Sequence, residues 1–286
     1  MKSYKPTSNP RRQMTTVSYG DHLTVSKPHK ALTTGLRSHA GRNSFGRITA
    51  YYKGGGNKRA YREIDFVYNK FDIPATIKTV EYDPYRTAFI SLVTYKDGEK
   101  RYVVLPKSLK VGDTFVASEK ADIKPGNRLP LKNIPVGTFI YNIEVKPRGG
   151  AKLVRAAGNY AKVIAQDAGY TLIKLPSTEI RKVNDTCWAS IGEVSNDENW
   201  LTVVGKAGRS RWLGIRPKVR ASAKNPVDHP YGGGEQKSGR GRRRAITRTG
   251  RMVGKGQKSR HPKKYSNVFI VSRRQVGKNK GETSTN

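Results

Sequence analysis

The chain has 286 residues, of which 56 are Lys or Arg and 21 are Asp or Glu, so its net charge is +35 at pH 7. This imbalance favours a polyanionic partner such as nucleic acid, because phosphates neutralise charge that would otherwise repel itself. The single cysteine, Cys187, rules out an internal disulfide, and no apolar stretch is long enough for a secretory signal or a membrane span. We therefore expect a soluble, intracellular protein.

The charge divides the chain into three parts. Residues 1–60 hold twelve Lys or Arg and one acid, residues 61–201 hold twenty-one and seventeen, and residues 202–286 hold twenty-three and three. With a hydrophobic fraction of 35%, the nearly balanced middle is the part that can form a core. The two basic arms are expected to be ordered by their partner.

The N-terminal arm contains two clusters that combine cations, amides and glycines. A flexible connector is the alternative for each cluster alone, but the pair beside a folded domain favours an RNA-contacting surface. The candidate residues are Arg42, Asn43, Arg47, Lys53, Gly54, Gly55, Gly56, Lys58 and Arg59.

The middle part predicts short β-strands, because its segments are rich in β-branched and aromatic residues and are bounded by turn residues. Residues 96–99 (KDGE) predict a hairpin turn. The first set of strands is expected at 61–68, 76–82, 88–95 and 101–105, and the second at 138–144, 161–166, 171–175 and 188–194.

The Pro-Gly-Asn break at 125–127 separates the two sets, which favours two small β-barrels. A single β-sandwich across the middle is the alternative. The predicted organisation is a basic extension at 1–60, a first barrel at 61–124, a second barrel at 125–201 and a basic extension at 202–286.

The C-terminal arm begins with a short basic segment that could form a helix and that contains Lys206, Arg209, Arg211 and Trp212. Residues 225–235 follow, with three consecutive glycines, Gly232, Gly233 and Gly234, that allow close backbone approach to a phosphate. His229, next to Asp228, could stack on a base, donate to phosphate or titrate near neutrality. A solvated loop with an incidental histidine is the alternative.

A run of arginine, lysine and glycine with almost no apolar residues follows this loop. It cannot form a core, and arginine binds phosphates and stacks on bases, so we interpret the run as an arm that threads RNA and folds on binding. Its candidate RNA-binding residues are Arg240, Arg242, Arg243, Arg244, Lys255, Lys258 and Arg260.

Signals for enzymes are weak. Residues 250–255 resemble a phosphate-binding P-loop, but they are one residue short between the glycines and Gly256 stands where Ser or Thr is needed. The five histidines have no metal-ligand spacing, so no metal and no cofactor are expected. Cys187 lies in a strand-like run and is interpreted as a small core residue.

From end to end, the chain resembles the universal large-subunit ribosomal protein family number two, in its bacterial form. The resemblance rests on segments 5–8, 11–12, 41–43, 46–49, 54–59, 61–62, 81–84, 86–88, 126–127, 129–131, 205–209, 211–212 and 225–235. It implies an OB-like barrel followed by an SH3-like barrel, with basic arms embedded in large-subunit rRNA beside neighbouring ribosomal proteins.

The resemblance also implies a position near the peptidyl transferase centre, with roles in subunit assembly, subunit joining and tRNA binding. His229 would be the loop residue closest to that chemistry, in a supporting role, because RNA makes the peptide bond. The sequence departs from the family pattern at Lys224, Tyr231 and Gln236, and residues 244–250 lack the usual Pro-Trp-Gly. The family-like segment begins almost at Met1, so we expect no cleavable presequence and a bacterial cytoplasmic location; an organelle-encoded copy would look the same.

Two other functions fit parts of the sequence. A chromatin-like DNA binder would use the arms as polycations, and preference for structured RNA would distinguish it from the ribosomal protein. An enzyme acting on RNA would use His229 and Asp228 as an acid–base pair and would show turnover apart from the ribosome.

Overall fold

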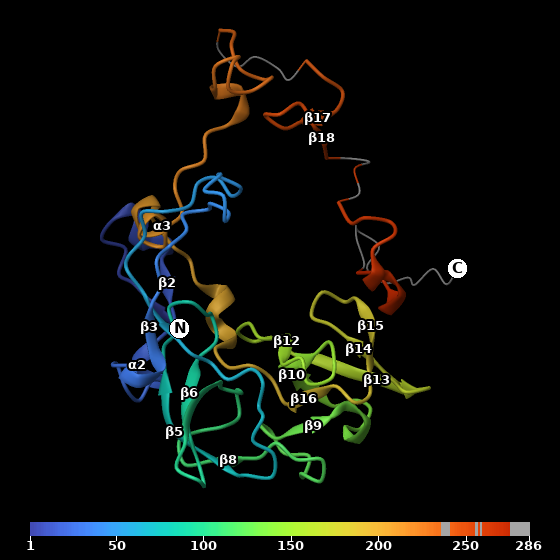
Figure 1. Cartoon of the computed structure of the whole chain (residues 1–286). Helices are drawn as coiled ribbons and strands as arrows, with labels where there is room; N and C mark the ends of the chain where they lie inside the picture. Colours follow the sequence, from blue (N-terminus) through green and yellow to red (C-terminus); the bar gives the residue numbers. More distant parts are fainter. Residues whose placement is uncertain (236–240, 255–256, 258, 275–286) are drawn as a thin grey trace. The chain divides into compact units, whose positions relative to one another are not determined.

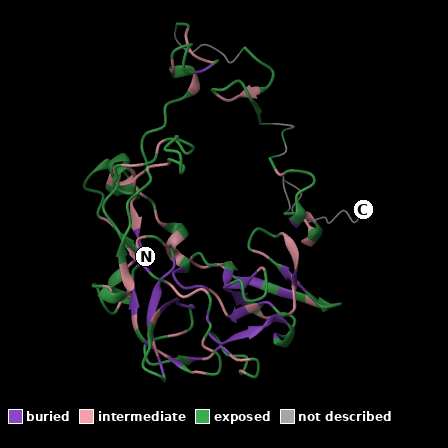
Figure 2. Ribbon diagram, in the orientation of Figure 1, coloured by how far each residue is buried: buried purple, intermediate pink, exposed green. Residues whose placement is uncertain are grey.

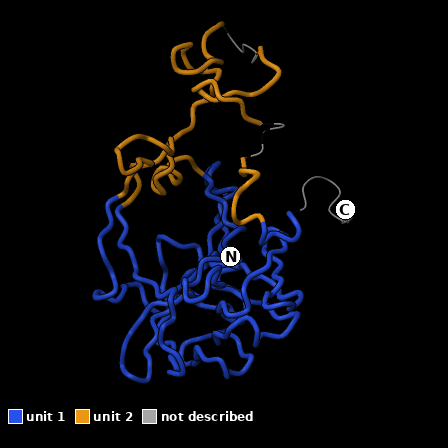
Figure 3. The backbone as a smooth tube through the Cα atoms, turned by 45° about the vertical axis from the view of Figure 1, so that its right-hand side comes forward, with its two compact units in different colours: residues 1–37, 58–205, 268–286 blue, residues 38–57, 206–267 orange. Residues whose placement is uncertain are grey.

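The structure, a computed structural model, describes residues 1–235, 241–254, 257 and 259–274, and these are mainly β (Figure 1). The chain divides into two units (Figure 3). Unit 1 comprises residues 1–37, 58–205 and 268–286, and unit 2 comprises residues 38–57 and 206–267. Within the described ranges, no helix has the length and apolar character needed to cross a membrane.

The first sheet of unit 1 contains four strands and confirms most of the first predicted set. Its strands pair in the order β7-β6-β5-β8, all antiparallel. Alternate side chains such as Ile77, Val93, Val103 and Phe115 point into one core cluster, as expected for β-branched and aromatic residues on a half-buried sheet. The strands are β5 (Ala75–Glu81), β6 (Ile90–Tyr95), β7 (Lys100–Val104) and β8 (Thr114–Phe115).

The beginning of the chain packs against this first sheet. Val17 belongs to its core cluster, and the buried Tyr102 hydroxyl accepts the N–H of His29 at 2.8 Å and donates to Glu81 at 2.6 Å. Residues 1–37 are therefore part of unit 1. The elements here are β1 (Lys2–Ser3), α1 (Asn9–Gln13), β2 (Thr15–Thr16), α2 (Tyr19–His22), η1 (Lys30–Leu32) and β3 (Thr33–Gly35), and β3 pairs with β4 (Ala60–Arg62).

The strand expected at 61–68 ends early, at Arg62. The Asp65 carboxylate accepts the N–H groups of Val67 and Tyr68, each at 2.9 Å, and Tyr68 adopts a left-handed φ of 53°. This side-chain turn competes with the extended backbone that a strand needs. The prediction of a strand beyond Arg62 is wrong for that reason.

The second sheet has its own core and an antiparallel order of β19-β15-β14-β13-β10-β16-β9. Leu131, Ile140, Val163 and Ile173 fill that core together with Cys187, whose burial raises its thiol pKa to about 12. The strands are β9 (Arg128–Pro130), β10 (Phe139–Tyr141), β13 (Ala161–Asp167), β14 (Tyr170–Lys174), β15 (Ile180–Asn184), β16 (Trp188–Ile191) and β19 (Ile270–Ser272).

Two details of the second sheet differ from expectation. The strand expected at 138–144 is interrupted at Asn142, which has a left-handed φ of 49°, so the chain leaves the sheet as β11 (Ile143–Glu144) and pairs with β12 (Ala151–Leu153). Three strands of this sheet were not expected, β9, β15 and β19, and β19 adds a segment of the C-terminal extension to the edge of the sheet. The short helices η2 (Leu131–Asn133) and η3 (Asp197–Leu201) flank the sheet strands.

The two sheets share no strand among the described residues, and each surrounds its own main core cluster. A smaller cluster that contains Val104, Tyr141 and Val194 joins them within unit 1. The buried residues in Figure 2 follow these strands. Two curled sheets with separate cores therefore replace the alternative of one β-sandwich.

Candidate nucleic-acid interface

Unit 2 has almost no hydrophobic core. Of its described residues, only His229 and Ser266 are buried (Figure 2). Backbone hydrogen bonds and short pairings hold it together instead. Its elements are α3 (Ala207–Trp212), η4 (Ala221–Ala223), β17 (Ala245–Ile246) and β18 (Met252–Val253), and η5 (Tyr265–Phe269) crosses its boundary with unit 1.

The first basic cluster forms a tight loop. The Asn43 side-chain oxygen accepts the N–H groups of Phe45 at 3.1 Å and Arg47 at 3.0 Å, and Arg42 forms a β-bridge with Ile48. Phe45 stays 85% exposed at the tip of this loop. The loop therefore presents two arginines and an aromatic ring on a fixed backbone.

The glycine triplet is explained by a close contact between two backbones. Gly54 donates its N–H to Gly214 at 2.9 Å, and Asn57 donates to Trp212 at 3.0 Å. A Cβ on Gly56 would lie 2.8 Å from the Gly214 nitrogen, which is closer than real Cβ contacts. Gly56 thus joins the N-terminal segment to the end of α3, while Lys53 extends the contact by a β-bridge to Ile215.

Helix α3 carries the basic segment that the sequence identified. The Lys206 ammonium lies 4.8 Å from the centre of the Trp212 ring, and this ring remains 55% exposed. Arg209 and Arg211 lie in the last turn of the helix, where cations are favoured by the helix dipole. An exposed indole with adjacent cations suits stacking on a nucleobase next to its phosphate.

The loop around His229 is ordered and not merely solvated. His229 is 8% exposed, and its Nδ1 accepts the N–H of Tyr231 at 3.1 Å. The Gly232 N–H bonds to the His229 carbonyl at 2.8 Å, and a Cβ on Gly232 would lie 2.3 Å from the Asn225 carbonyl oxygen. Gly232 is therefore required for loop closure.

The departure at Tyr231 has a structural role. Its ring centre lies 4.9 Å from that of His229, and its hydroxyl oxygen accepts the N–H of Ile246 at 2.6 Å. Tyr231 thus connects the His229 loop to the hairpin of β17 and β18. Asp228 is exposed and, among the described residues, has no hydrogen bond to the His229 side chain. The geometry gives no acid–base pair.

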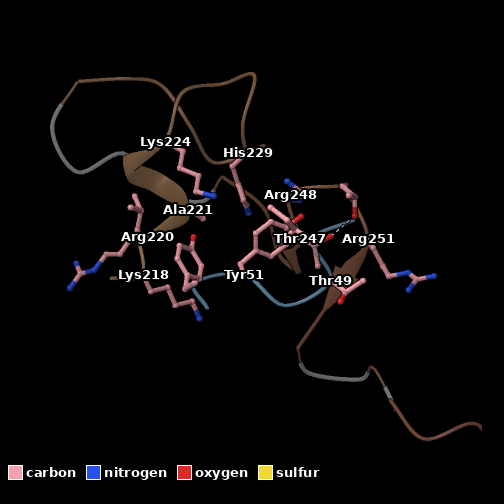
Figure 4. Close-up of a pocket in the computed structure, with 14 residues that line it drawn as sticks. Thr49, Tyr51, Lys218, Arg220, Ala221, Lys224, His229, Thr247, Arg248 and Arg251 are labelled. Atoms are coloured by element: carbon pink, nitrogen blue, oxygen red, sulfur yellow. Dashed lines mark hydrogen bonds between the residues drawn. The ribbon is translucent and has the colours of Figure 1, made fainter. Parts of the chain in front are cut away.

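His229 lines a pocket of about 710 Å³ in unit 2 (Figure 4). No acidic residue lines it within the described part of the chain, and the Arg248 guanidinium lies 4.4 Å from the centre of the Tyr51 ring. Threonine hydroxyls of Thr49 and Thr247 add neutral polar groups. The cations in its lining are Lys218, Arg220, Lys224, Arg248 and Arg251.

This pocket contains residues that the sequence analysis did not select, namely Tyr51, Tyr52, Lys218 and Arg220. The available signal was a Tyr-Tyr pair directly after the first basic loop, together with the alternating cations at 218 and 220. Nothing in the sequence showed that segments 48–52, 218–224 and 247–251 meet.

Other predicted residues lie elsewhere. Arg59 belongs to unit 1, where it donates to the Pro84 carbonyl at 3.0 Å and stacks 4.7 Å from the Tyr85 ring centre. Lys58 is also in unit 1. Arg260 bonds to Asn267 and Ser266. Arg242, Arg243 and Arg244 precede the β17–β18 hairpin, and Arg240, Lys255 and Lys258 lie outside the described residues.

No group of three His, Cys, Asp or Glu side chains that could hold a metal ion occurs within the described ranges. Unit 2 combines cations, exposed aromatic rings and closely approaching backbone segments. These are the features by which proteins bind single-stranded nucleic acid.

Two family models match the chain. Residues 29–117 match Ribosomal Proteins L2, RNA binding N-terminal domain, and residues 124–250 match Ribosomal Proteins L2, C-terminal domain. The first match covers the first sheet and the second covers most of the second sheet, consistent with an OB-fold and an SH3-like barrel. The chain belongs to the L2 family of ribosomal proteins, structural RNA-binding components of the large ribosomal subunit that contact rRNA and other ribosomal proteins.

Proposed function

We propose that unit 2 binds large-subunit rRNA through the pocket around His229, and thereby supports the architecture of the peptidyl transferase centre. The observation that carries this proposal is the pocket lining, in which five cations and two tyrosines occur without an acid among the described residues. Phosphates neutralise the cations, and the tyrosine rings offer surfaces for bases. By the same contacts the protein supports subunit assembly, subunit association and tRNA binding.

In this proposal His229 positions RNA and is not a general base. Its Nδ1 already accepts the Tyr231 N–H, so the remaining ring nitrogen, Nε2, is the one that can donate to RNA in the neutral imidazole. Its 8% exposure suits a group that holds the loop in place. The peptide bond itself is made by RNA.

The proposal extends to the organisation of the chain. The extensions at 1–60 and 202–286 supply RNA contacts, and the barrels at 61–124 and 125–201 anchor them. The proposed compartment is the cytoplasm, or an organelle that encodes its own copy.

The test uses large subunits reconstituted with variant proteins. Arg220→Gln and Arg248→Gln each remove one cation from the pocket, and Lys174→Gln is the matched control, because Lys174 is an exposed lysine on β14 of unit 1. We expect each pocket variant to weaken rRNA binding and to reduce the slope of log affinity against log salt by about 1, as expected for one lost phosphate contact.

The same particles measure the role of His229. We expect subunits with His229→Ala to assemble normally. They should form peptide bonds more slowly than the wild type and bind tRNA more weakly. A peptide-bond rate equal to that of the wild type would remove the supporting role of His229. Pocket variants that bind rRNA as tightly as Lys174→Gln would overturn the pocket as an RNA site.

A further inference from the structure

We propose that a second, separate cavity, in unit 1, receives one unstacked base of the rRNA. The cavity has a volume of about 290 Å³ and lies where the loop at 67–71 meets β9 and β16 of the second sheet and β11 of the β11–β12 pair. This volume is close to the lower limit of small-molecule pockets, roughly 300 Å³, which suits a single planar group. The inference is independent of unit 2 and of the role of His229.

The walls of this cavity are aromatic and open to solvent. Phe71 is 42% exposed, and its ring centre lies 5.0 Å from that of Trp188, with the planes inclined by 45°. Val67, which is 57% exposed, lines the same cavity. Exposed aromatic rings at the mouth of a pocket in so basic a protein suit a nucleobase, because stacking on such rings tolerates every base.

The floor of the cavity is polar, charged and fully buried. Arg128 is 1% exposed and donates to Glu144 at 3.0 Å and to the Asn142 carbonyl at 2.8 Å. Glu144 is 2% exposed, and its carboxylate also accepts the backbone N–H of Trp188 at 3.2 Å, so the Arg128–Glu144 pair holds the strand that carries the indole. Hydrogen-bond donors and acceptors at the floor of the cavity suit the polar edge of a nucleobase. An aliphatic ligand has no such polar edge.

The loop is held in shape before any ligand arrives. Tyr68 packs 4.6 Å from the Arg128 guanidinium, and its hydroxyl accepts from the Asn142 amide at 3.0 Å. Asp65 holds the turn through two backbone N–H groups, and Ala151 donates to the Phe66 carbonyl at 2.7 Å. A preorganised site loses less conformational entropy on binding.

The charge at the rim favours a nucleotide over an aromatic side chain of a neighbouring protein. Arg128 and Glu144 neutralise each other, whereas Arg148 lines the cavity and takes part in none of the ion pairs found among the described residues. A guanidinium at the mouth can bind the phosphate of the inserted nucleotide. Bases inside a duplex are stacked on both faces, so the ligand is an unpaired nucleotide.

The first test is ultraviolet crosslinking of intact large subunits, followed by nuclease and protease digestion and mass spectrometry. We expect nucleotide adducts on Phe71 or Trp188. In Phe71→Ala particles the adduct should be lost, whereas it should persist in Phe139→Ala particles. Phe139 is the matched control, because it is 40% exposed and its ring lies 4.6 Å from that of Tyr160 on the same unit.

The second test measures binding by the full chain. In a Trp200→Phe, Trp212→Phe background, Trp188 is the only indole, and single-stranded hexaadenylate should quench its fluorescence more strongly than an RNA duplex with equal phosphates. Phe71→Ala should weaken hexaadenylate binding about 5- to 150-fold, as for one lost base–aromatic stack. Phe71→Leu should do the same, because it retains apolar volume without a π-face, and circular dichroism reports whether each variant is folded.

Three outcomes would overturn the site. They are equal quenching by single strand and duplex, unchanged affinity in a folded Phe71→Ala chain, and crosslinks from Phe71 or Trp188 that lead to another protein and not to a nucleotide. Arg220→Gln in the same background isolates this inference from the pocket in unit 2, because it should leave Trp188 quenching unchanged.

Discussion

Unit 1 and unit 2 are stabilised by different physical means. Every buried hydrophobic side chain among the described residues belongs to unit 1, whereas unit 2 is held by backbone pairings and by close approaches such as that between Gly56 and Gly214. Hydrophobic burial stabilises a fold in water without a partner. A segment that lacks such burial and carries mostly cations gains its stability from phosphates. We therefore expect unit 1 to be a self-sufficient scaffold and unit 2 to depend on RNA for its stability.

The largest expected effect tests whether unit 1 is stabilised by its own buried contacts in the absence of RNA. Arg128→Met leaves the Glu144 carboxylate buried without its partner, which should reduce the free energy of unfolding by about 3–5 kcal/mol. Urea denaturation of the RNA-free protein, followed by circular dichroism, measures the change. The double variant with Glu144→Gln should recover part of the loss, and a loss below about 1 kcal/mol in the single variant would contradict a buried, paired carboxylate.

The next effect should be confined to unit 2. In Gly56→Ala the new methyl group meets the Gly214 backbone, a strain of about 1–3 kcal/mol, so the contact between the two segments should open. We expect weaker rRNA binding by filter assay and an unchanged urea transition of unit 1. Gly208→Ala is the control, because a Cβ there has nothing within 4 Å and should leave binding intact. A shifted urea transition in Gly56→Ala would mean that the two units do not respond independently.

A paired substitution compares the two units directly. Ile140→Val in the second core should cost about 0.5–1.5 kcal/mol, because Ile140 is fully buried and a methyl-sized cavity remains. Ile215→Val in unit 2 should change the free energy of unfolding by less than about 0.5 kcal/mol, because Ile215 is 47% exposed. If Ile140→Val and Ile215→Val lower the free energy of unfolding equally in the urea assay, the two units do not differ in how they are stabilised.

The smallest expected effect depends on pH. Hydrogen bonds from Lys70 lower the pKa of Asp97, and hydrogen bonds from Arg101 and Lys70 lower the pKa of Glu99. Carboxylates with lowered folded-state pKa values stabilise the fold above their usual pKa near 4, and this contribution disappears as the pH falls through the lowered values. Urea midpoints from pH 6 down to pH 2 should fall less steeply in Lys70→Met. Lys78→Met, which removes an exposed lysine of β5, should follow the wild type.

Much of unit 1 could be predicted from the sequence, because β-branched and aromatic residues with intervening turns determine strands locally. Two predicted strands differ in the structure because of local side-chain or backbone features that strand propensity does not include. The Asp65 carboxylate ends the strand expected at 61–68, and the left-handed Asn142 divides the strand expected at 138–144. β19 was missed because its partner, β15, lies about ninety residues away in the sequence.

For unit 2, the residue types could be predicted but not their arrangement. Composition selected cations, glycines and His229, because these residue types are the ones suited to phosphate. It did not show that Gly56 serves a contact between two backbones, or that His229 lies in a pocket with Tyr51 and Arg220. Those neighbours come from distant segments, and no periodic pattern connects them.

Because β19 pairs with β15, the edge of the second sheet is completed only late in synthesis of the chain. Ile180 and Arg181 pair with Ser272 and Ile270, so the outer strand of the second sheet is covered by residues made about ninety positions later. A chain interrupted before residue 268 would leave β15 as an open edge, whose unpaired N–H and C=O groups can capture strands from other chains. The edge of β15 is therefore protected from aggregation only when synthesis of the C-terminal arm has passed β19. Chains truncated before residue 268 should self-associate.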